Sequence, residues 1–169
     1  SMTYEIAICD DEEKQRTYMK SLVERWLHQT FHHAQIREYA SSEQFLFEQA
    51  DVMTQILFLD IEMEKMDGIA LAKEIRKHNR QMQIIFVTGY MEYIQEGYDV
   101  DALHYLLKPV SQEKTDSVLE RAVERLKTAD AVLFVESSGE LTRIPLHEIR
   151  YIESNRNYNI IHADNDYEM

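Results

Sequence analysis

Carboxylate, hydroxyl and ammonium side chains stand at the ends of four short apolar runs in this sequence. The carboxylates are Asp10, Asp11 and Asp60, and the other two groups are Thr88 and Lys108. Three carboxylates brought together repel one another unless a cation is present, and Mg²⁺ is a hard ion that binds carboxylate and carbonyl oxygens. An aspartate that attacks phosphorus gives an acyl phosphate, and the transition state spreads charge over three equatorial oxygens. A metal ion, a hydroxyl and an ammonium group can each stabilise one of these oxygens, so the five residues suit phosphoryl transfer.

Each of these features also has an ordinary structural interpretation when it is taken alone. An Asp-Asp pair before a helix often caps the helix and interacts with its dipole. Lys108 before Pro109 is typical of a turn, and Thr88 is a β-branched residue of the kind found at strand ends. Packing alone does not explain why five polar groups end four apolar strands of one sheet. The joint pattern therefore favours a functional site.

The segments between these residues have the periodicity of alternating strands and helices. Short, mostly apolar runs predict strands at residues 6–9, 56–59, 84–87 and 103–107, and the mixed segment at residues 35–39 can form a further strand. Amphipathic or capped segments predict helices at residues 18–27, 42–46, 67–75, 90–98 and 111–126. Continuous apolar strands between such helices indicate a parallel sheet covered on both faces. We therefore predict an α/β fold with a doubly wound, five-stranded parallel sheet, whose site lies at the carboxyl ends of the strands.

The pattern changes after residue 128. Strands are predicted at residues 132–135, 141–146, 150–153 and 158–163, separated by turns. No helix is predicted here, and so short an all-β stretch rarely forms a stable core alone. We expect two parts, residues 1–128 and residues 129–169, of which the second is an incomplete domain.

Charge and composition argue against several classes of function. The net charge is −13, and residues 131–169 contain three basic and seven acidic side chains, which argues against non-specific binding to DNA or to a membrane surface. No apolar run is as long as a membrane span, and the N-terminus lacks the plan of a signal peptide. Cys9 is the single cysteine, so a disulfide framework is excluded. These features predict a cytoplasmic protein without a membrane partner.

Five motifs resemble the receiver domains of two-component response regulators. They are Ile-Cys-Asp-Asp-Glu at residues 8–12, Leu-Asp-Ile-Glu-Met at 59–63, Met-Asp-Gly-Ile at 66–69, Phe-Val-Thr-Gly at 86–89 and Tyr-Leu-Leu-Lys-Pro at 105–109. Their order and spacing match the family across residues 4–128. The resemblance implies a flavodoxin-like receiver domain over residues 1–128 that acts in phosphorelay signal transduction.

The resemblance also implies a role for each acidic residue. Asp60 is expected to be the phosphoacceptor, with a sensor histidine kinase as the phosphoryl donor. Asp11, Asp60 and the backbone carbonyl of Glu62 are expected to bind Mg²⁺ (or Mn²⁺). Asp10 is expected to reach the metal through a water molecule.

Further expectations concern the phosphoryl group and the conformational switch. Thr88 and Lys108 are expected to bind the phosphoryl oxygens, and the Lys108–Pro109 peptide bond is expected to be cis. Thr88 then moves toward the phosphoryl group, and Tyr105, at the position of the family's switch aromatic, turns into the space that Thr88 leaves. The alternative is that Tyr105 is only a half-buried strand residue. The phosphorylated protein is expected to form a homodimer.

Some residues beside the site differ from the family pattern or vary within the family. Glu64 and Lys65 stand where members with a related second domain often have Pro-Gly, so they place charge near the site and alter the loop without removing a catalytic group. Glu62 and Tyr90 flank the water path to the phosphoryl group. Residues at these two positions tune dephosphorylation in the family.

Residues 129–169 resemble the opening of a LytTR domain, the mostly-β DNA-binding module of LytR/AgrA-type regulators. The resemblance depends on the pattern Pro-Leu-x-x-Ile-x-Tyr-Ile-Glu at residues 145–153. The loop that follows matches by position a loop that family members insert into a major groove, and Asn and Arg side chains can read base edges. Its residues are Asn155, Arg156, Asn157 and Tyr158. The alternative is a solvated turn. DNA binding is expected of the complete output domain and is expected to be weak or absent in this chain.

Two other functions compete with that of a phosphorylation-controlled transcription regulator. A Mg²⁺-dependent phosphatase of the aspartyl-phosphate kind usually needs a second aspartate two residues after the nucleophile, and position 62 is Glu. A phosphorylation-independent receiver that acts as a protein-interaction module would normally have lost one of the acidic residues or Lys108, and none is lost. We therefore expect a protein that catalyses its own phosphoryl transfer and dephosphorylation and is not otherwise an enzyme.

Overall fold

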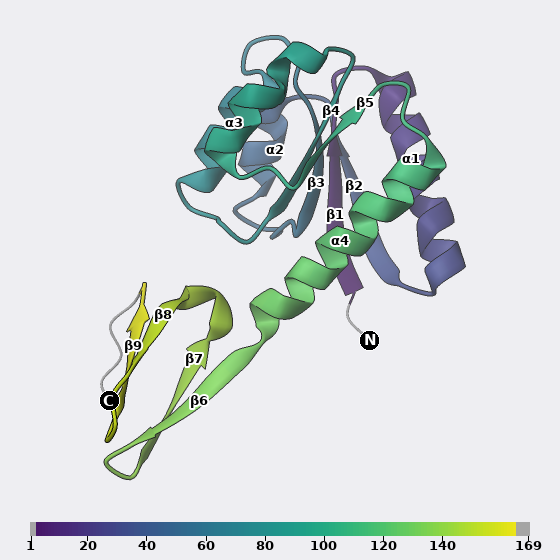
Figure 1. Cartoon of the computed structure of the whole chain (residues 1–169). Coiled ribbons are helices and arrows are strands. Elements are labelled where there is room, and N and C mark those ends of the chain that lie inside the picture. The colour runs from purple at the N-terminus through teal and green to yellow at the C-terminus, as the bar shows by residue number, and fades with distance from the viewer. Residues whose placement is uncertain (1–2, 165–169) are drawn as a thin grey trace. The chain divides into compact units, whose positions relative to one another are not determined.

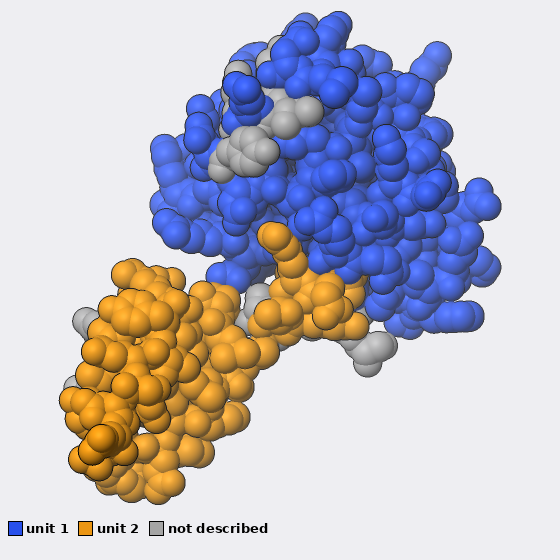
Figure 2. Space-filling view, in the orientation of Figure 1, with its two compact units in different colours: residues 1–122 blue, residues 123–169 orange. Residues whose placement is uncertain are grey.

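The chain forms two compact units in a computed structural model, residues 1–122 and residues 123–169 (Figure 2). The structure describes residues 3–164, except for the side chains of residues 93–94, 96–98 and 129–130. The division between the units falls inside helix α4 (Gln112–Asp130). The domain boundary expected after residue 128 lies in the same helix and stays a prediction.

Five parallel strands form the sheet of the first unit (Figure 1). They are β1 (Thr3–Cys9), β2 (His33–Tyr39), β3 (Ile56–Asp60), β4 (Gln83–Thr88) and β5 (His104–Leu107). Their order across the sheet is β2-β1-β3-β4-β5. Every residue of the central strand β3 is buried, as expected for a strand covered by helices on both faces. The predicted doubly wound, five-stranded parallel sheet is therefore confirmed.

Helices cover both faces of this sheet (Figure 1). On one face lie α1 (Glu13–Thr30) and the part of α4 that belongs to the first unit, and on the other lie α2 (Ser42–Glu48) and α3 (Gly68–Arg76). The core of the second face joins Phe45 of α2 and Leu71 of α3 to Leu59 and Phe86 of the sheet. The strand ends that carry the polar residues are therefore held by a packed core.

The starts of these helices follow from short polar side chains. Ser41 caps α2 by accepting a hydrogen bond from the backbone N–H of Gln44, and Asp67 caps α3 in the same way. The residue that caps α1 is Glu12, which makes no side-chain capping bond. Neither Asp10 nor Asp11 is therefore the N-cap residue of α1, although Asp10 Oδ1 accepts a hydrogen bond from the backbone N–H of Glu12.

The segment predicted as a helix at residues 90–98 has a tighter geometry. It is a 3₁₀ helix, η1 (Met91–Val100). The sequence contains Gly97 and Asp99 together with β-branched and aromatic residues, which have low α-helix propensity. Periodicity identified a helical segment here but not which kind of helix forms.

The second unit consists of two antiparallel hairpins. The first pairs β6 (Val132–Ser137) with β7 (Glu140–Pro145), and the second pairs β8 (Ile149–Ser154) with β9 (Asn159–Ala163). A short 3₁₀ helix, η2 (Leu146–Glu148), connects them. Ser138 and Gly139 at the tip of the first hairpin both have positive φ, as a tight two-residue hairpin turn requires. The prediction of a mostly-β segment is confirmed.

Within residues 3–164, no helix has the length and the apolar character needed to cross a bilayer.

Candidate functional site

The register of the sheet brings the polar residues of the sequence to one edge. Asp10 follows the last residue of β1, Asp60 ends β3, Thr88 ends β4 and Lys108 follows the last residue of β5. Parallel pairing places Asp60 opposite Val87, one residue before Thr88. Because all five strands run in the same direction, their carboxyl ends meet at this edge.

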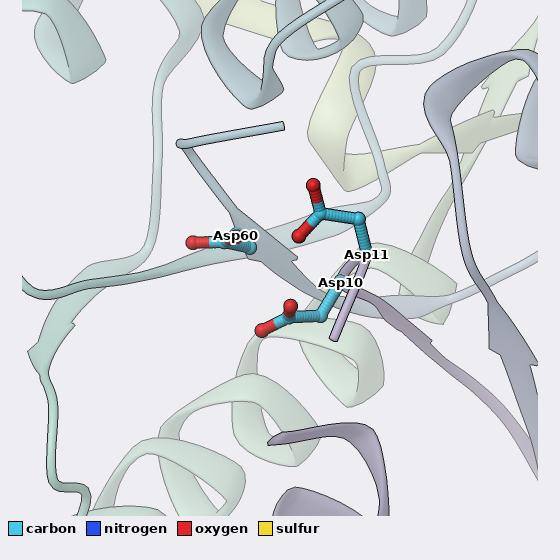
Figure 3. Close-up of side chains that lie close together, drawn as sticks. All are labelled: Asp10, Asp11 and Asp60. Carbon is cyan, nitrogen blue, oxygen red and sulfur yellow. The ribbon is translucent and has the colours of Figure 1, made fainter. Parts of the chain in front are cut away.

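Three carboxylates gather at the ends of β1 and β3 (Figure 3). Asp10, Asp11 and Asp60 each offer an oxygen, and these oxygens lie within 4.8 Å of one another. Asp10 and Asp60 are each only 5% exposed, whereas Asp11 is open to solvent. We call this cluster of Asp10, Asp11 and Asp60 the acidic cup. Two of its carboxylates are buried, and the third is exposed to solvent.

Lys108 lies against the two buried carboxylates. Its Nζ is 3.0 Å from Asp10 Oδ2 and 3.4 Å from Asp60 Oδ1. Its backbone N–H donates to the carbonyl of Thr88, which ties the end of β5 to that of β4. Burial by itself would lower the pKa of Lys108, but its hydrogen bond to Asp10 and its attraction to Asp60 raise the pKa above the ordinary value. Lys108 is therefore a positive charge held beside the two buried carboxylates.

Asp60 has the most perturbed carboxyl group of the site. Burial and, to a lesser degree, the neighbouring charge of Asp10 together raise the pKa of Asp60 to about 7, although Lys108 opposes both effects. A backbone hydrogen bond from Glu62 also favours the charged form. Without a cation, Asp60 therefore changes between its neutral and charged forms near neutral pH.

The raised pKa of Asp60 predicts that the free energy of unfolding of the metal-free protein depends on pH. Because the folded-state pKa of about 7 lies above the ordinary value of 3.8, ionising Asp60 lowers the stability as pH rises from the lower value to the higher. Asp60→Asn removes the charge, so in the presence of a chelator we expect it to unfold with a free energy higher by on the order of 2 to 4 kcal/mol at about pH 8. The difference should shrink steadily as the pH falls below about 7, which urea titrations at several pH values will measure. A gap that is constant with pH would contradict the assignment.

Thr88 and Tyr105, the two residues of the expected switch, lie on the neighbouring strands β4 and β5. Thr88 is buried, and its Oγ1 accepts a hydrogen bond from the backbone N–H of Tyr90 at 3.1 Å. The ring of Tyr105 is half-buried and stacks on Phe86 with 5.1 Å between centroids. Both the switch role of Tyr105 and the simple packing role are compatible with this contact, so the switch role stays a prediction.

The connection after Lys108 and the start of α1 add contacts to the site. The Lys108–Pro109 peptide bond is cis. Arg16 donates from Nη1 to the backbone carbonyl of Asp10 at 2.8 Å, and Tyr18 donates to the carbonyl of Val110 at 2.6 Å. Helical spacing places both side chains on the first helix, but nothing in the sequence indicates that they turn back to these carbonyls.

The loop between β8 and β9 has an internal hydrogen-bond pattern of its own. The backbone N–H of Asn155 donates to the carbonyl of Tyr158 at 2.8 Å, and the N–H of Arg156 donates to Asn155 Oδ1 at 2.6 Å. All four side chains of residues 155–158 are exposed. This order is compatible with a recognition loop and with a solvated turn, so the DNA-contact role of Asn155, Arg156, Asn157 and Tyr158 stays a prediction.

The donor set of the acidic cup fits a magnesium ion. Carboxylate oxygens are the ligands that Mg²⁺ prefers, and the ion keeps several waters, so an open side is compatible with it. Asp10 and Asp60 are buried side by side with Lys108 as the cation that pairs with both. A divalent cation would relieve the remaining repulsion.

Known proteins resemble this chain in sequence. A family model described as the response regulator receiver domain matches residues 6–120. Sensory transduction protein LytT of Bacillus subtilis is 30% identical over 116 residues, which are 69% of this chain and 46% of LytT. Accessory gene regulator protein A of Staphylococcus epidermidis is 33% identical over 130 residues, which are 72% of this chain and 55% of that protein. The chain thus spans about half the length of the curated relatives it matches.

A solved structure has the same fold as the first unit. The response regulatory domain of protein mrkE from Klebsiella pneumoniae superposes with a TM-score of 0.66 at 21% identity. The superposition covers 73% of this chain and 98% of that domain.

Proposed function

The chain belongs to the response regulator receiver family, and on that premise we propose that Asp60 accepts a phosphoryl group in a Mg²⁺-dependent reaction. The observation that supports this most directly is the cluster of Asp10, Asp11 and Asp60 with Lys108 bonded to the two buried members. An ordinary surface cluster of acidic residues would not hold a half-buried ammonium group against its buried members.

The acidic residues hold the cation and supply the nucleophile. Asp11, Asp60 and the backbone carbonyl of Glu62 would hold the metal, and Asp10 would interact with it through a water molecule. When bound, Mg²⁺ (or Mn²⁺) neutralises the site and favours the charged form of Asp60. A carboxylate oxygen of Asp60 forms the new bond to phosphorus while the bond to the donor, a histidine nitrogen of a kinase or the acetate of acetyl phosphate, breaks.

Lys108 and Thr88 stabilise the charge that the transferred group brings. The ammonium of Lys108 already lies 3.4 Å from Asp60, so it can donate a hydrogen bond to a terminal oxygen of the phosphoryl group once phosphorus is bonded to Asp60. Thr88 ends the neighbouring strand β4, and its hydroxyl is the donor for a second phosphoryl oxygen. Movement of Thr88 toward that oxygen, with Tyr105 turning behind it, is the switch that we propose.

The output of the switch is proposed from the relatives. Relatives are named as sensory transduction and accessory gene regulator proteins. We propose a cytoplasmic regulator that receives its phosphoryl group from a sensor histidine kinase, dimerises when phosphorylated and controls transcription. Residues 129–169 are then the first part of a LytTR-type domain, with DNA binding by the complete domain.

Intact mass spectrometry of the whole chain tests the chemistry. The protein is incubated with acetyl phosphate in Mg²⁺ and, separately, with excess chelator. We expect a single phosphoryl adduct that forms with Mg²⁺ and is absent with chelator. No adduct under either condition would refute the proposal and favour a phosphorylation-independent interaction module.

A further inference from the structure

The loop of residues 61–67, which follows Asp60, is fastened to the start of α2. We propose that Ser42 and Glu43 are positioning residues that hold this loop and thereby set the affinity of the acidic cup for Mg²⁺. The inference rests on the proposed function, because it concerns the metal that the cup is proposed to bind. Neither residue touches the three carboxylates, so both act through the loop backbone.

Two side chains of α2 bind both polar groups of one loop residue. Ser42 Oγ donates to the backbone carbonyl of Met66 at 2.9 Å, and the backbone N–H of Met66 donates to Glu43 Oε1 at 3.3 Å. Ser42 has no exposed surface, so its hydroxyl cannot bond to water and depends on the carbonyl of Met66 as its partner. This pair of bonds clasps Met66, and we call it the Met66 clasp.

The loop needs hydrogen bonds from outside it because the backbone conformation of one of its residues is unfavourable. Lys65, directly before Met66, has φ of 60°, a left-handed conformation that costs a non-glycine residue roughly 1 kcal/mol. The other end of the loop is closed by a hydrogen bond from the N–H of Gly68 to the carbonyl of Ile61 at 2.9 Å. If the clasp is removed, Lys65 can relax while the closure at Gly68 remains.

Relaxation of the loop would reach the metal site through Glu62. The backbone N–H of Glu62 bonds to the carboxylate of Asp60, and its carbonyl is the proposed metal ligand. A shift of the loop therefore displaces the carbonyl of Glu62, which is one proposed ligand. It also weakens the hydrogen bond from the N–H of Glu62 to Asp60, which is another. Mg²⁺ demands nearly ideal octahedral geometry, so a small displacement weakens its binding. The phosphoacceptor itself, at the end of a fully buried strand, stays in place.

Mg²⁺ titration of the full chain by calorimetry tests this role. Ser42→Ala and Glu43→Ala are each expected to weaken Mg²⁺ binding by about fivefold, as the loss of one hydrogen bond would. The rate of adduct formation from acetyl phosphate should approach the wild-type rate once Mg²⁺ saturates. Glu43→Gln keeps an acceptor for the N–H of Met66 and should bind Mg²⁺ nearly as well as wild type. Glu74→Ala, which removes an exposed carboxylate paired with Lys77 on α3, is the matched control.

Hydrogen exchange without metal gives a second, independent readout. In Ser42→Ala and Glu43→Ala, the amides of residues 62–66 should exchange faster, while those of β3 keep their protection. Unchanged Mg²⁺ affinity and unchanged exchange in both variants would overturn the clasp while leaving the receiver chemistry intact. Equal loss of affinity and of saturated rate, with Glu43→Gln as impaired as Glu43→Ala, would show a merely structural role and also overturn it. A wild-type chain that binds no Mg²⁺ would overturn the clasp and the proposed function together.

Discussion

Asp60→Asn is expected to abolish the Mg²⁺-dependent phosphoryl adduct while leaving the fold intact. The substitution keeps the shape of the side chain but replaces the nucleophilic oxygen anion with a neutral amide, which cannot form an acyl phosphate. Asp10, the other buried carboxylate of the site, is not free to take over the role, because it pairs with Lys108 at 3.0 Å and accepts the backbone N–H of Glu12. Intact mass after incubation with acetyl phosphate and Mg²⁺ measures the result directly.

A second aspartate provides the control for this substitution. Asp51 is exposed and lies in the turn after α2. Asp51→Asn removes the same charge and should form the adduct at the wild-type rate. An adduct that survives Asp60→Asn would move the phosphoacceptor to another residue, and loss of the adduct in both variants would point to a general effect of charge.

Much of the first unit could be predicted from the sequence because its signals are strong and mutually consistent. Strands β1, β3 and β4 each contain a continuous apolar run, as strands of a parallel sheet buried on both faces do. Asp10, Asp60 and Thr88 end or directly follow such runs, and parallel strands bring their ends to one edge. The meeting of these residues thus follows from topology, without knowledge of any individual contact.

Other parts of the site could not be predicted because they depend on side chains turning back to the backbone. The buried hydroxyl of Ser42, for example, donates to the backbone carbonyl of Met66, which is 24 residues away in sequence. Arg16 reaches the carbonyl of Asp10 from the first turn of α1. No periodicity reports such contacts, since exposed and inward-turning polar residues look alike in a sequence. The same limit applies to η1, where helical spacing does not separate a 3₁₀ helix from an α-helix.

Gly68→Ala is expected to destabilise the protein by about 3 kcal/mol or more and to slow phosphorylation sharply. A Cβ atom built on Gly68 would lie 2.1 Å from the backbone oxygen of Asp60, far inside van der Waals contact. Gly68 is also the first residue of α3, where alanine would otherwise favour the helix by about 1 kcal/mol. The sign of the measured change therefore tells which effect dominates. We expect the clash to dominate, because the atom that must give way is backbone and not a flexible side chain.

Urea unfolding and the rate of adduct formation measure the two consequences of this clash separately. Relief of the contact requires either the start of α3 or the end of β3 to move, and the latter would carry the carboxylate of Asp60 away from Lys108. The matched control is Gly89→Ala, because a Cβ at Gly89 meets no atom within 4 Å although this glycine directly follows Thr88. Gly89→Ala should keep both stability and rate near wild type. If Gly68→Ala were as stable as Gly89→Ala, the close approach of α3 to Asp60 would be refuted; if it were unstable but phosphorylated at the wild-type rate, the strain would be absorbed by α3 and not by the phosphoacceptor.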